Sequence, residues 1–386
     1  MESHQDLPDE LGRVPLTDLV KELHHRPETT FLQTNLVSDG FVPAIQTDPN
    51  LINPWGMSSS TTSPIWISDN GTGLASIYGV SDGTVTVNRI PPVTIAPATP
   101  GGDPAAPTGQ VFNAFQADNA FMLRDGQPAN FLFATEDGTI SGWNPGAGTQ
   151  SIITVNESID PSAGDEMLGL GAVYKGLAVG QTDEGPMLYA ANFRHGTVDM
   201  FDAGFNHVKS FTDPDLPAGY APFNVQVLGD KLFVTFALQD DTKHDDVAGK
   251  GNGFVDAFDL EGHMIDRVGS GGTLDSPWGL AIAPQSFGKF AGDLLVGNFG
   301  DGTINAFDPN DDRFLGRLLG GDGKPIAIGD LWALIPGNGG AGGDPNALYF
   351  TAGVQNEAHG LFGSLTPNPA PDQTGVMGSG AHSMFG

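Results

Sequence analysis

The chain has 386 residues, of which 55 are glycine and 29 proline, and only 16% are charged. This composition disfavours long helices and favours short strands joined by tight turns. Lys and Arg number 16 against 46 Asp and Glu, and the formal charge of -30 argues against binding to nucleic acid or to an anionic membrane surface. The absence of cysteine excludes disulfides, thiolate metal sites and cysteine nucleophiles.

Residues 1–30 are predicted to form a polar leader before the folded domain. They contain no basic segment followed by an apolar one, so the sequence shows no signal peptide. No run of about 18 apolar residues occurs in the chain, which predicts that no segment spans a membrane.

One hairpin pattern recurs along the chain. The segment LLVGNFGDGTINAFDP at 294–309 is nearly copied by MLYAANFRHGTVDMFDA at 187–203, with a strand, a glycine-centred turn and a second strand. Aligned on the turn glycine, the pattern occurs at Gly73, Gly138, Gly196, Gly253, Gly302 and Gly360. A repeat of roughly 50 to 65 residues is a small sheet that must stack on its neighbours to bury both faces.

A short apolar segment precedes each hairpin, and a further strand follows most of them. The preceding segments are 53–57, 119–123, 175–179, 222–227, 276–282 and 331–335. Four strands per repeat is the pattern of a propeller blade, so residues 31–367 are predicted to form an all-β, six-bladed β-propeller. The last repeat lacks its own outer strand, and we expect FLQTNLVSDG at 31–40 to supply it and close the ring. Residues 368–386 lack periodic apolar residues and are predicted to be a disordered tail.

Several segments resemble a known family. The stretches DPNLINPWGM at 48–57, KHDDVAGKGNGFVDAFD at 243–259 and SPWGLAIAPQSFGKFAGDLLVGNFGDGTINAFDP at 276–309 look like the uncharacterised bacterial propeller family associated with exosortase (PEP-CTERM) sorting signals. The resemblance implies a six-bladed propeller that is exported, so we expect an extracellular or periplasmic location. It implies no established activity and no catalytic residues. The sequence ends without the sorting signal, so anchoring by that route is not expected.

Two catalytic patterns occur outside the context that their chemistry needs. Residues 79–83 match the G-x-S-x-G pattern of hydrolases, whose serine lies on a strand-to-helix elbow, but a strand-to-strand loop is predicted here. Residues 337–342 match G-x-G-x-x-G, but no helix follows to direct its N-terminus at a phosphate. We interpret both as glycine-rich loops.

The fourth repeat carries an acidic insertion, QDDTKHDDVAG at 239–249. Its carboxylates repel one another unless solvent or a bound cation separates them. Carboxylate and carbonyl oxygens suit Ca²⁺ best, so Ca²⁺ is the expected ion, and no organic cofactor is indicated. The predicted ligands are Asp240, Asp241, Asp245 and Asp246. The alternative is a solvated loop whose charge is screened by Lys243.

Polar residues on the inner strands and at strand ends form a second candidate site. In a propeller these positions converge on a central tunnel, where ligands commonly bind. The candidates are Asn53, Asp69, Glu136, Lys175, Asn192, Asn224, Asn298 and Glu357. His195 and His359 precede turn glycines in opposite blades, so we do not expect them to share a metal ion.

Functions from different classes fit these observations. The first is an extracytoplasmic propeller that binds a small molecule or a protein, or serves as a scaffold, without catalysis. The second is a metal-assisted hydrolase or lactonase acting in the tunnel, similar to gluconolactonase-type propellers in architecture only. A lyase like virginiamycin B lyase is a third. We favour the first, because convergent polar groups alone are a weak signal for an enzyme.

Overall fold

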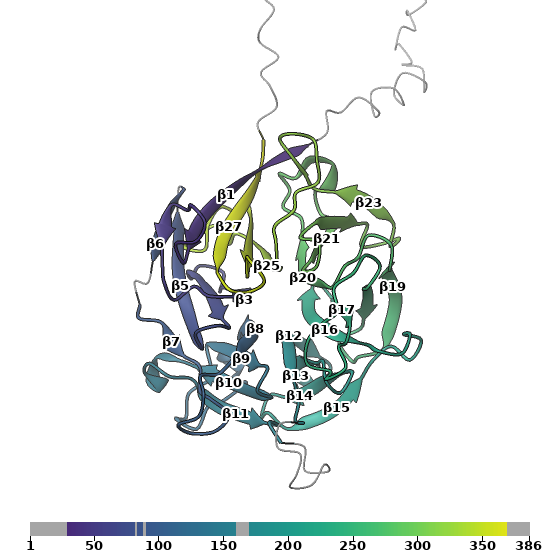
Figure 1. Ribbon diagram of the computed structural model, residues 1–386. Coiled ribbons are helices and arrows are strands. Elements are labelled where there is room, and N and C mark those ends of the chain that lie inside the picture. The colour runs from purple at the N-terminus through teal and green to yellow at the C-terminus, as the bar shows by residue number, and fades with distance from the viewer. Residues whose placement is uncertain (1–28, 82, 88–89, 160–169, 369–386) are drawn as a thin grey trace, which may run out of the picture. The chain divides into compact units, whose positions relative to one another are not determined.

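The computed structural model describes residues 29–81, 83–87, 90–159 and 170–368. Six sheets stand around a ring (Figure 1). The predicted all-β, six-bladed β-propeller is therefore confirmed. Residues 1–28 of the predicted leader and 369–386 of the predicted tail lie outside the described residues.

The first three blades follow one another in chain order. Blade one contains β3 (Pro54–Ser58), β4 (Ile65–Asp69), β5 (Leu74–Ser81) and β6 (Thr84–Val87), and β7 (Val93–Thr94) pairs with β5. Blade two contains β8 (Pro107–Phe112), β9 (Phe131–Thr135), β10 (Thr139–Trp143) and β11 (Ile152–Asn156). Blade three contains β12 (Tyr174–Thr182), β13 (Gly185–Asn192), β14 (Thr197–Asp202) and β15 (His207–Phe211).

The remaining blades complete the ring. Blade four contains β16 (Tyr220–Leu228), β17 (Lys231–Leu238), β18 (Phe254–Phe258) and β19 (Met264–Ser270). Blade five contains β20 (Pro277–Ile282), β21 (Leu294–Asn298), β22 (Ile304–Phe307) and β23 (Phe314–Arg317). Blade six contains β25 (Leu331–Pro336), β26 (Leu348–Ala352), β27 (Leu361–Pro367) and β1 (Thr30–Ser38), with β2 (Gln46–Thr47) and β24 (Leu319–Gly320) beside β1.

The N-terminal strand closes the ring, as the sequence predicts. Strand β1 runs antiparallel to β27, from Phe31 opposite Pro367 to Ser38 opposite Leu361. Figure 1 shows this purple strand against the yellow C-terminal strand. The pairing joins the two ends of the propeller and covers the edge that β27 would otherwise expose.

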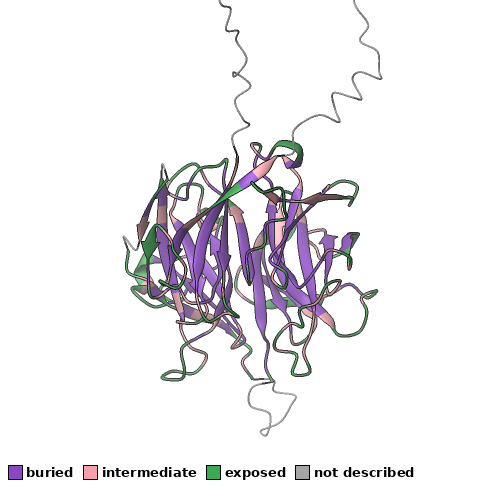
Figure 2. Ribbon diagram, turned by 45° about the horizontal axis from the view of Figure 1, so that its top comes forward, coloured by how far each residue is buried: buried purple, intermediate pink, exposed green. Residues whose placement is uncertain are grey.

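The strands are buried because each sheet lies between two others. Strands β4, β9, β18, β21 and β26 are buried along their whole length. Figure 2 shows buried residues running through the strands and exposed residues concentrated in the loops. Both faces of a blade must therefore be apolar, which is why Val, Ile, Leu and Phe fill these strands without strict alternation.

The turn glycines are needed for two different structural reasons. Gly73, Gly138, Gly196 and Gly302 have φ between 69° and 77°, the left-handed region that side chains disfavour. Gly360 is not in that region, and a Cβ there would lie 1.8 Å from the carbonyl oxygen of Leu51. The alignment on these glycines is therefore right for two physical reasons, backbone conformation and close packing.

One inner strand was predicted in the wrong place. The inner strand of blade two is β8, whereas residues 119–123 lie in the connection to β9, where Asn119 and Phe121 have positive φ. The error arises because Phe121 is fully buried, so an apolar loop resembles a strand in the sequence. Among the described residues, no helix has the length and apolar character needed to cross a bilayer.

Candidate functional site

One face of the ring brings distant parts of the chain together. Each blade is antiparallel, so the start of its inner strand lies beside the end of its second strand. Pro54 of β3 pairs with Asp69 of β4, and Pro277 of β20 pairs with Asn298 of β21. The loops that follow the second strands therefore surround the ring axis at this face.

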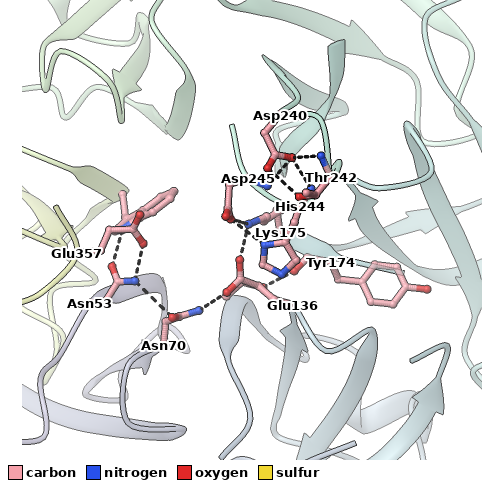
Figure 3. A network of polar contacts seen from close by, with 12 residues as sticks. Asn53, Asn70, Glu136, Tyr174, Lys175, Asp240, Thr242, His244, Asp245 and Glu357 are labelled. Carbon is pink, nitrogen blue, oxygen red and sulfur yellow. Dashed lines mark hydrogen bonds and ion pairs between the residues drawn. The ribbon is translucent and has the colours of Figure 1, made fainter. Parts of the chain in front are cut away.

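Side chains from five blades meet there in one network of polar contacts (Figure 3). We call this region the central mouth. It comprises Asn53 and Asn70 of blade one, Glu136 of blade two, Lys175 of blade three, His244 and Asp245 of blade four, and Glu357 of blade six.

Lys175 is the centre of one half of the network. Its side chain is only 1% exposed, and its ammonium group contacts the carboxylate of Glu136 and lies 3.4 Å from Asp245 Oδ1. The ammonium also lies 4.9 Å from the centre of the Trp55 ring. Asp245 Oδ1 in turn contacts Nδ1 of His244 at 2.8 Å. A buried lysine is thus held by two carboxylates and an aromatic face.

Two asparagines join this cluster to Glu357. Asn70 Nδ2 donates to Glu136 Oε2 at 2.9 Å, and Asn53 Nδ2 donates to Asn70 Oδ1 at 3.3 Å. Asn53 Nδ2 also donates to Glu357 Oε2 at 2.6 Å, while Asn53 Oδ1 accepts from the indole of Trp332 at 3.0 Å. The amides fix the positions of Glu136 and Glu357 on either side of blade one.

Burial and neighbouring charges shift the pKa values of the mouth residues in different directions. Burial alone would lower the pKa of Lys175, but the charges of Glu136 and Asp245 outweigh it and raise the pKa. The hydrogen bond to Asp245 raises the pKa of His244 and lowers that of Asp245 to about 2. Burial raises the pKa of Glu357 to about 7. The mouth therefore holds a charged lysine, an ionised aspartate and a carboxyl group that titrates near neutral pH.

The backbone around the mouth is strained. Gln355, Asn356 and Glu357 have φ of 65°, 54° and 64° in succession. Glutamine and glutamate gain nothing from the left-handed conformation, which costs about 1 kcal/mol or more per residue. Asn53, just before β3, has a φ of 45°. Strain of this kind concentrates at functional sites, because it holds side chains where a ligand needs them.

Aromatic side chains close the tunnel beneath the mouth. Trp55 and Trp332 stack with ring centres 3.5 Å apart, and Phe299 stacks on Trp332 at 4.2 Å. Below them, the inner strands leave a cavity of only about 10 Å³, room for a single water molecule. The tunnel between the inner strands therefore cannot hold a ligand larger than water.

The other predicted tunnel residues hold strands together. Asp69 accepts a hydrogen bond from Ser76 at 2.5 Å, and Asn192 donates to Asp199 at 2.8 Å, each across its own hairpin. Asn298 donates to the carbonyl of Thr273 at 2.8 Å. Asn224 donates to the carbonyl of Trp278 at 2.7 Å and so links neighbouring inner strands. None of these four belongs to the network of the central mouth.

The acidic insertion does not bring its four aspartates to one point. Asp240 accepts hydrogen bonds from the hydroxyl of Thr242 at 2.7 Å and the backbone N–H of His244 at 2.9 Å, which closes the turn. Asp241 is exposed, and burial raises the pKa of Asp246 to about 6. Asp245 is the aspartate of the insertion whose carboxylate contacts Lys175, and donor atoms of Glu136, His244 and Asp245 lie within 4.8 Å of one another.

Two residues of the mouth were not predicted from sequence. Asn70 follows directly after a strand end, so the rule that singled out Asp69 missed it by one position. His244 lies within the acidic insertion, for which the sequence predicts only carboxylate ligands. A histidine amid carboxylates is the signal that could have identified it.

The fold and the mouth define a six-bladed β-propeller with a polar, strained site on its axis. The chain is 31% identical over 374 residues to the uncharacterized protein R648 of Acanthamoeba polyphaga mimivirus, covering 93% of this chain and 86% of that protein. It is also 31% identical over 355 residues to the uncharacterized protein L690 of the same virus, covering 88% of this chain and 87% of that protein. The chain belongs to the family of these uncharacterized proteins.

No family model matches the chain. Among solved structures it is similar to the soluble aldose sugar dehydrogenase of Escherichia coli in its apo form, with a TM-score of 0.51 and 12% identity over 88% of this chain and 100% of that one. A streptogramin B lyase is similar at a TM-score of 0.46 and 10% identity, over 88% of this chain and 98% of that one. The likeness to the sugar dehydrogenase shows the fold alone. The resemblance to the exosortase-associated propellers stays a prediction.

Proposed function

We propose that the protein binds a small polar ligand at the central mouth with the help of a divalent cation held by Glu136, His244 and Asp245. The observation that carries the proposal is the spacing of their donor atoms, all within 4.8 Å of one another. Donors bound to one metal ion at about 2.1 Å lie about 3 to 4.2 Å apart, so small side-chain movements suffice.

The type of donor favours a borderline metal ion over Ca²⁺. Ca²⁺ takes oxygen ligands almost exclusively, whereas an imidazole with two carboxylates suits Mn²⁺ or Zn²⁺. The Ca²⁺ predicted from the insertion alone therefore gives way to Mn²⁺ or Zn²⁺ as the preferred ion. Asp240 is occupied by its own turn and Asp241 is exposed, so neither is assigned as a ligand here.

Three protein donors leave positions on the cation for the ligand. Across the mouth, Asn53, Asn70 and Glu357 form one hydrogen-bonded row, in which both N–H groups of Asn53 are donated while the second N–H of Asn70 and Oε1 of Glu357 can face a ligand. Adjacent donors and acceptors of this kind complement hydroxyl groups, and the open cation positions complement a carboxylate or hydroxyl oxygen. A small hydroxyl- or carboxylate-bearing molecule is the ligand class that fits.

Metal-assisted hydrolysis is a second candidate function, because Glu357 has a pKa of about 7. A carboxyl group near this value can give or take a proton at neutral pH. Turnover of a panel of lactones and esters, measured with and without chelator, separates the two candidates. Cation binding without turnover supports binding alone, and chelator-sensitive turnover supports hydrolysis.

The extracellular or periplasmic location stays a prediction.

The test of the proposed function is calorimetric titration of the full chain with MnCl₂, ZnCl₂ and CaCl₂. Glu136→Gln and Asp245→Asn should each weaken Mn²⁺ binding by about tenfold or more, since removal of one ligand costs over 1.4 kcal/mol. Asp241→Asn is the matched control, because it removes an equal charge from the same insertion at an exposed position. Equal weakening by Asp241→Asn and Asp245→Asn would overturn the site and indicate general attraction to an acidic loop.

A further inference from the structure

Lys175 occupies the position that the proposed cation would take. Its ammonium contacts Glu136 and lies 3.4 Å from Asp245 Oδ1, and these are two of the three proposed ligands. Two cations cannot share these carboxylates at such distances, because they repel each other and the Lys175 side chain is buried, although Asp245 is exposed. A divalent cation therefore has to displace the ammonium.

A third carboxylate, that of Asp246, can accept the displaced ammonium. Oδ2 of Asp246 is buried, and among the described residues the hydroxyl of Ser276 is the one side-chain donor that acts on this carboxyl group. Asp246 directly follows Asp245, whose Oδ1 lies 3.4 Å from the Lys175 ammonium, and its charge helps to raise the pKa of Lys175. A flexible four-carbon side chain can reach from one carboxylate to another without movement of the backbone.

We propose that Lys175 is a built-in competitor of the cation, bridging Glu136 and Asp245 when the site lacks a cation and moving to Asp246 when one binds. The inference rests on the proposed cation site. It assigns roles that sequence reasoning did not: Asp246 receives the displaced lysine and is not a metal ligand. It also makes the site selective, because only a cation that binds the three ligands strongly can displace a buried ion pair.

The displacement predicts that losing the lysine improves cation binding. Lys175→Met removes the competitor and leaves two carboxylates without their partner, so Mn²⁺ affinity should rise about tenfold or more. Lys250→Met is the matched control, since it removes the same charge from an exposed position directly after the acidic insertion, and it should change affinity less than twofold. Lys175→Gln serves as a second variant if Lys175→Met does not fold.

Asp246 distinguishes a receiving group from a ligand. Asp246→Asn should weaken Mn²⁺ binding several-fold in the wild-type background, because the displaced ammonium then lacks a partner. In the Lys175→Met background the same change should have almost no effect, because no ammonium has to move. If Asp246→Asn weakens binding equally in both backgrounds, Asp246 is a ligand and the proposed movement is wrong.

The wild-type protein offers a spectroscopic measurement of the movement. The ammonium lies 4.9 Å from the centre of the Trp55 ring, so its departure should change tryptophan emission on saturation with Zn²⁺. The change should be absent in Lys175→Met. Unchanged or weaker Mn²⁺ affinity in both Lys175 variants would overturn the inference while the cation site stands. Absence of binding by wild type and both variants would overturn the cation site itself.

Discussion

Replacing Lys175 with Met tests the buried ion pair at the centre of the mouth. The side chains of Lys175 and Glu136 are 1% and 12% exposed, so water screens neither charge effectively. Removing one partner of a buried pair leaves the other charge unpaired, at a cost of about 3–5 kcal/mol in the free energy of unfolding. Glu136→Gln should cost a similar amount for the same reason.

The double variant Lys175→Met with Glu136→Gln removes both charges of the pair. Its cost should be smaller than the sum of the two single costs by about 2–3 kcal/mol, the coupling typical of contacting charged groups. Urea unfolding at pH 7, followed by circular dichroism without added metal, measures all three values. Lys250→Met, an exposed control, should stay within about 0.5 kcal/mol of wild type.

The pH dependence of the same comparison has a definite sign. The pKa of Lys175 is raised above 10.5 in the folded state. The stability that the charged lysine contributes is therefore fully present below pH 10.5 and is lost only as pH rises through the folded-state pKa.

A loss of less than about 1 kcal/mol in the free energy of unfolding for Lys175→Met at pH 7, with additive costs of the two single variants, would refute the buried pair.

Three further predictions concern the ring and the mouth. Gly302→Ala should lower the free energy of unfolding in urea more than Gly196→Ala does. Both changes impose strain of about 1 kcal/mol at positive φ, but only the Cβ at 302 would lie 2.2 Å from the carbonyl oxygen of Ile328. Equal losses would contradict this. Deleting residues 31–40 should cause aggregation in light scattering, since it uncovers the edge of β27, whereas deleting residues 1–25 should be nearly neutral; similar melting of both truncations would contradict the closure. Because the pKa of Glu357 is raised from 4.5 to about 7, the stability of wild type relative to Glu357→Gln should fall by up to about 3 kcal/mol between pH 4.5 and 7, and a flat difference would contradict the buried carboxyl.

The sequence predicts the ring well because the repeats constrain it at many points. Turn glycines such as Gly73 and Gly302 require a special backbone conformation, and that requirement is readable in any one copy. The closing strand could be predicted because a propeller with a three-stranded last blade leaves an exposed edge. The inner strand of blade two was predicted in the wrong place because Phe121 is buried in a loop, and burial alone does not distinguish a loop from a strand.

The site was only half predictable. Asn53, Glu136, Lys175 and Glu357 were identified because strand ends converge in any propeller. Whether a side chain at such a position points to the axis or bonds across its own hairpin depends on a rotation that the sequence does not encode, and Asn192 bonds to Asp199 across its hairpin. The position of Asp245 beside Lys175 depends on the path of a long insertion, which no repeat constrains.

The proposed function requires that a divalent cation binds at the mouth. The most direct test is anomalous diffraction from crystals of the full chain grown with MnCl₂. We expect one strong anomalous peak within about 2.3 Å of carboxylate oxygens of Glu136 and Asp245 and of an imidazole nitrogen of His244, with the Lys175 ammonium moved away from Glu136. A peak at the exposed aspartates of the insertion alone, or no peak at the mouth at saturating Mn²⁺, would contradict it.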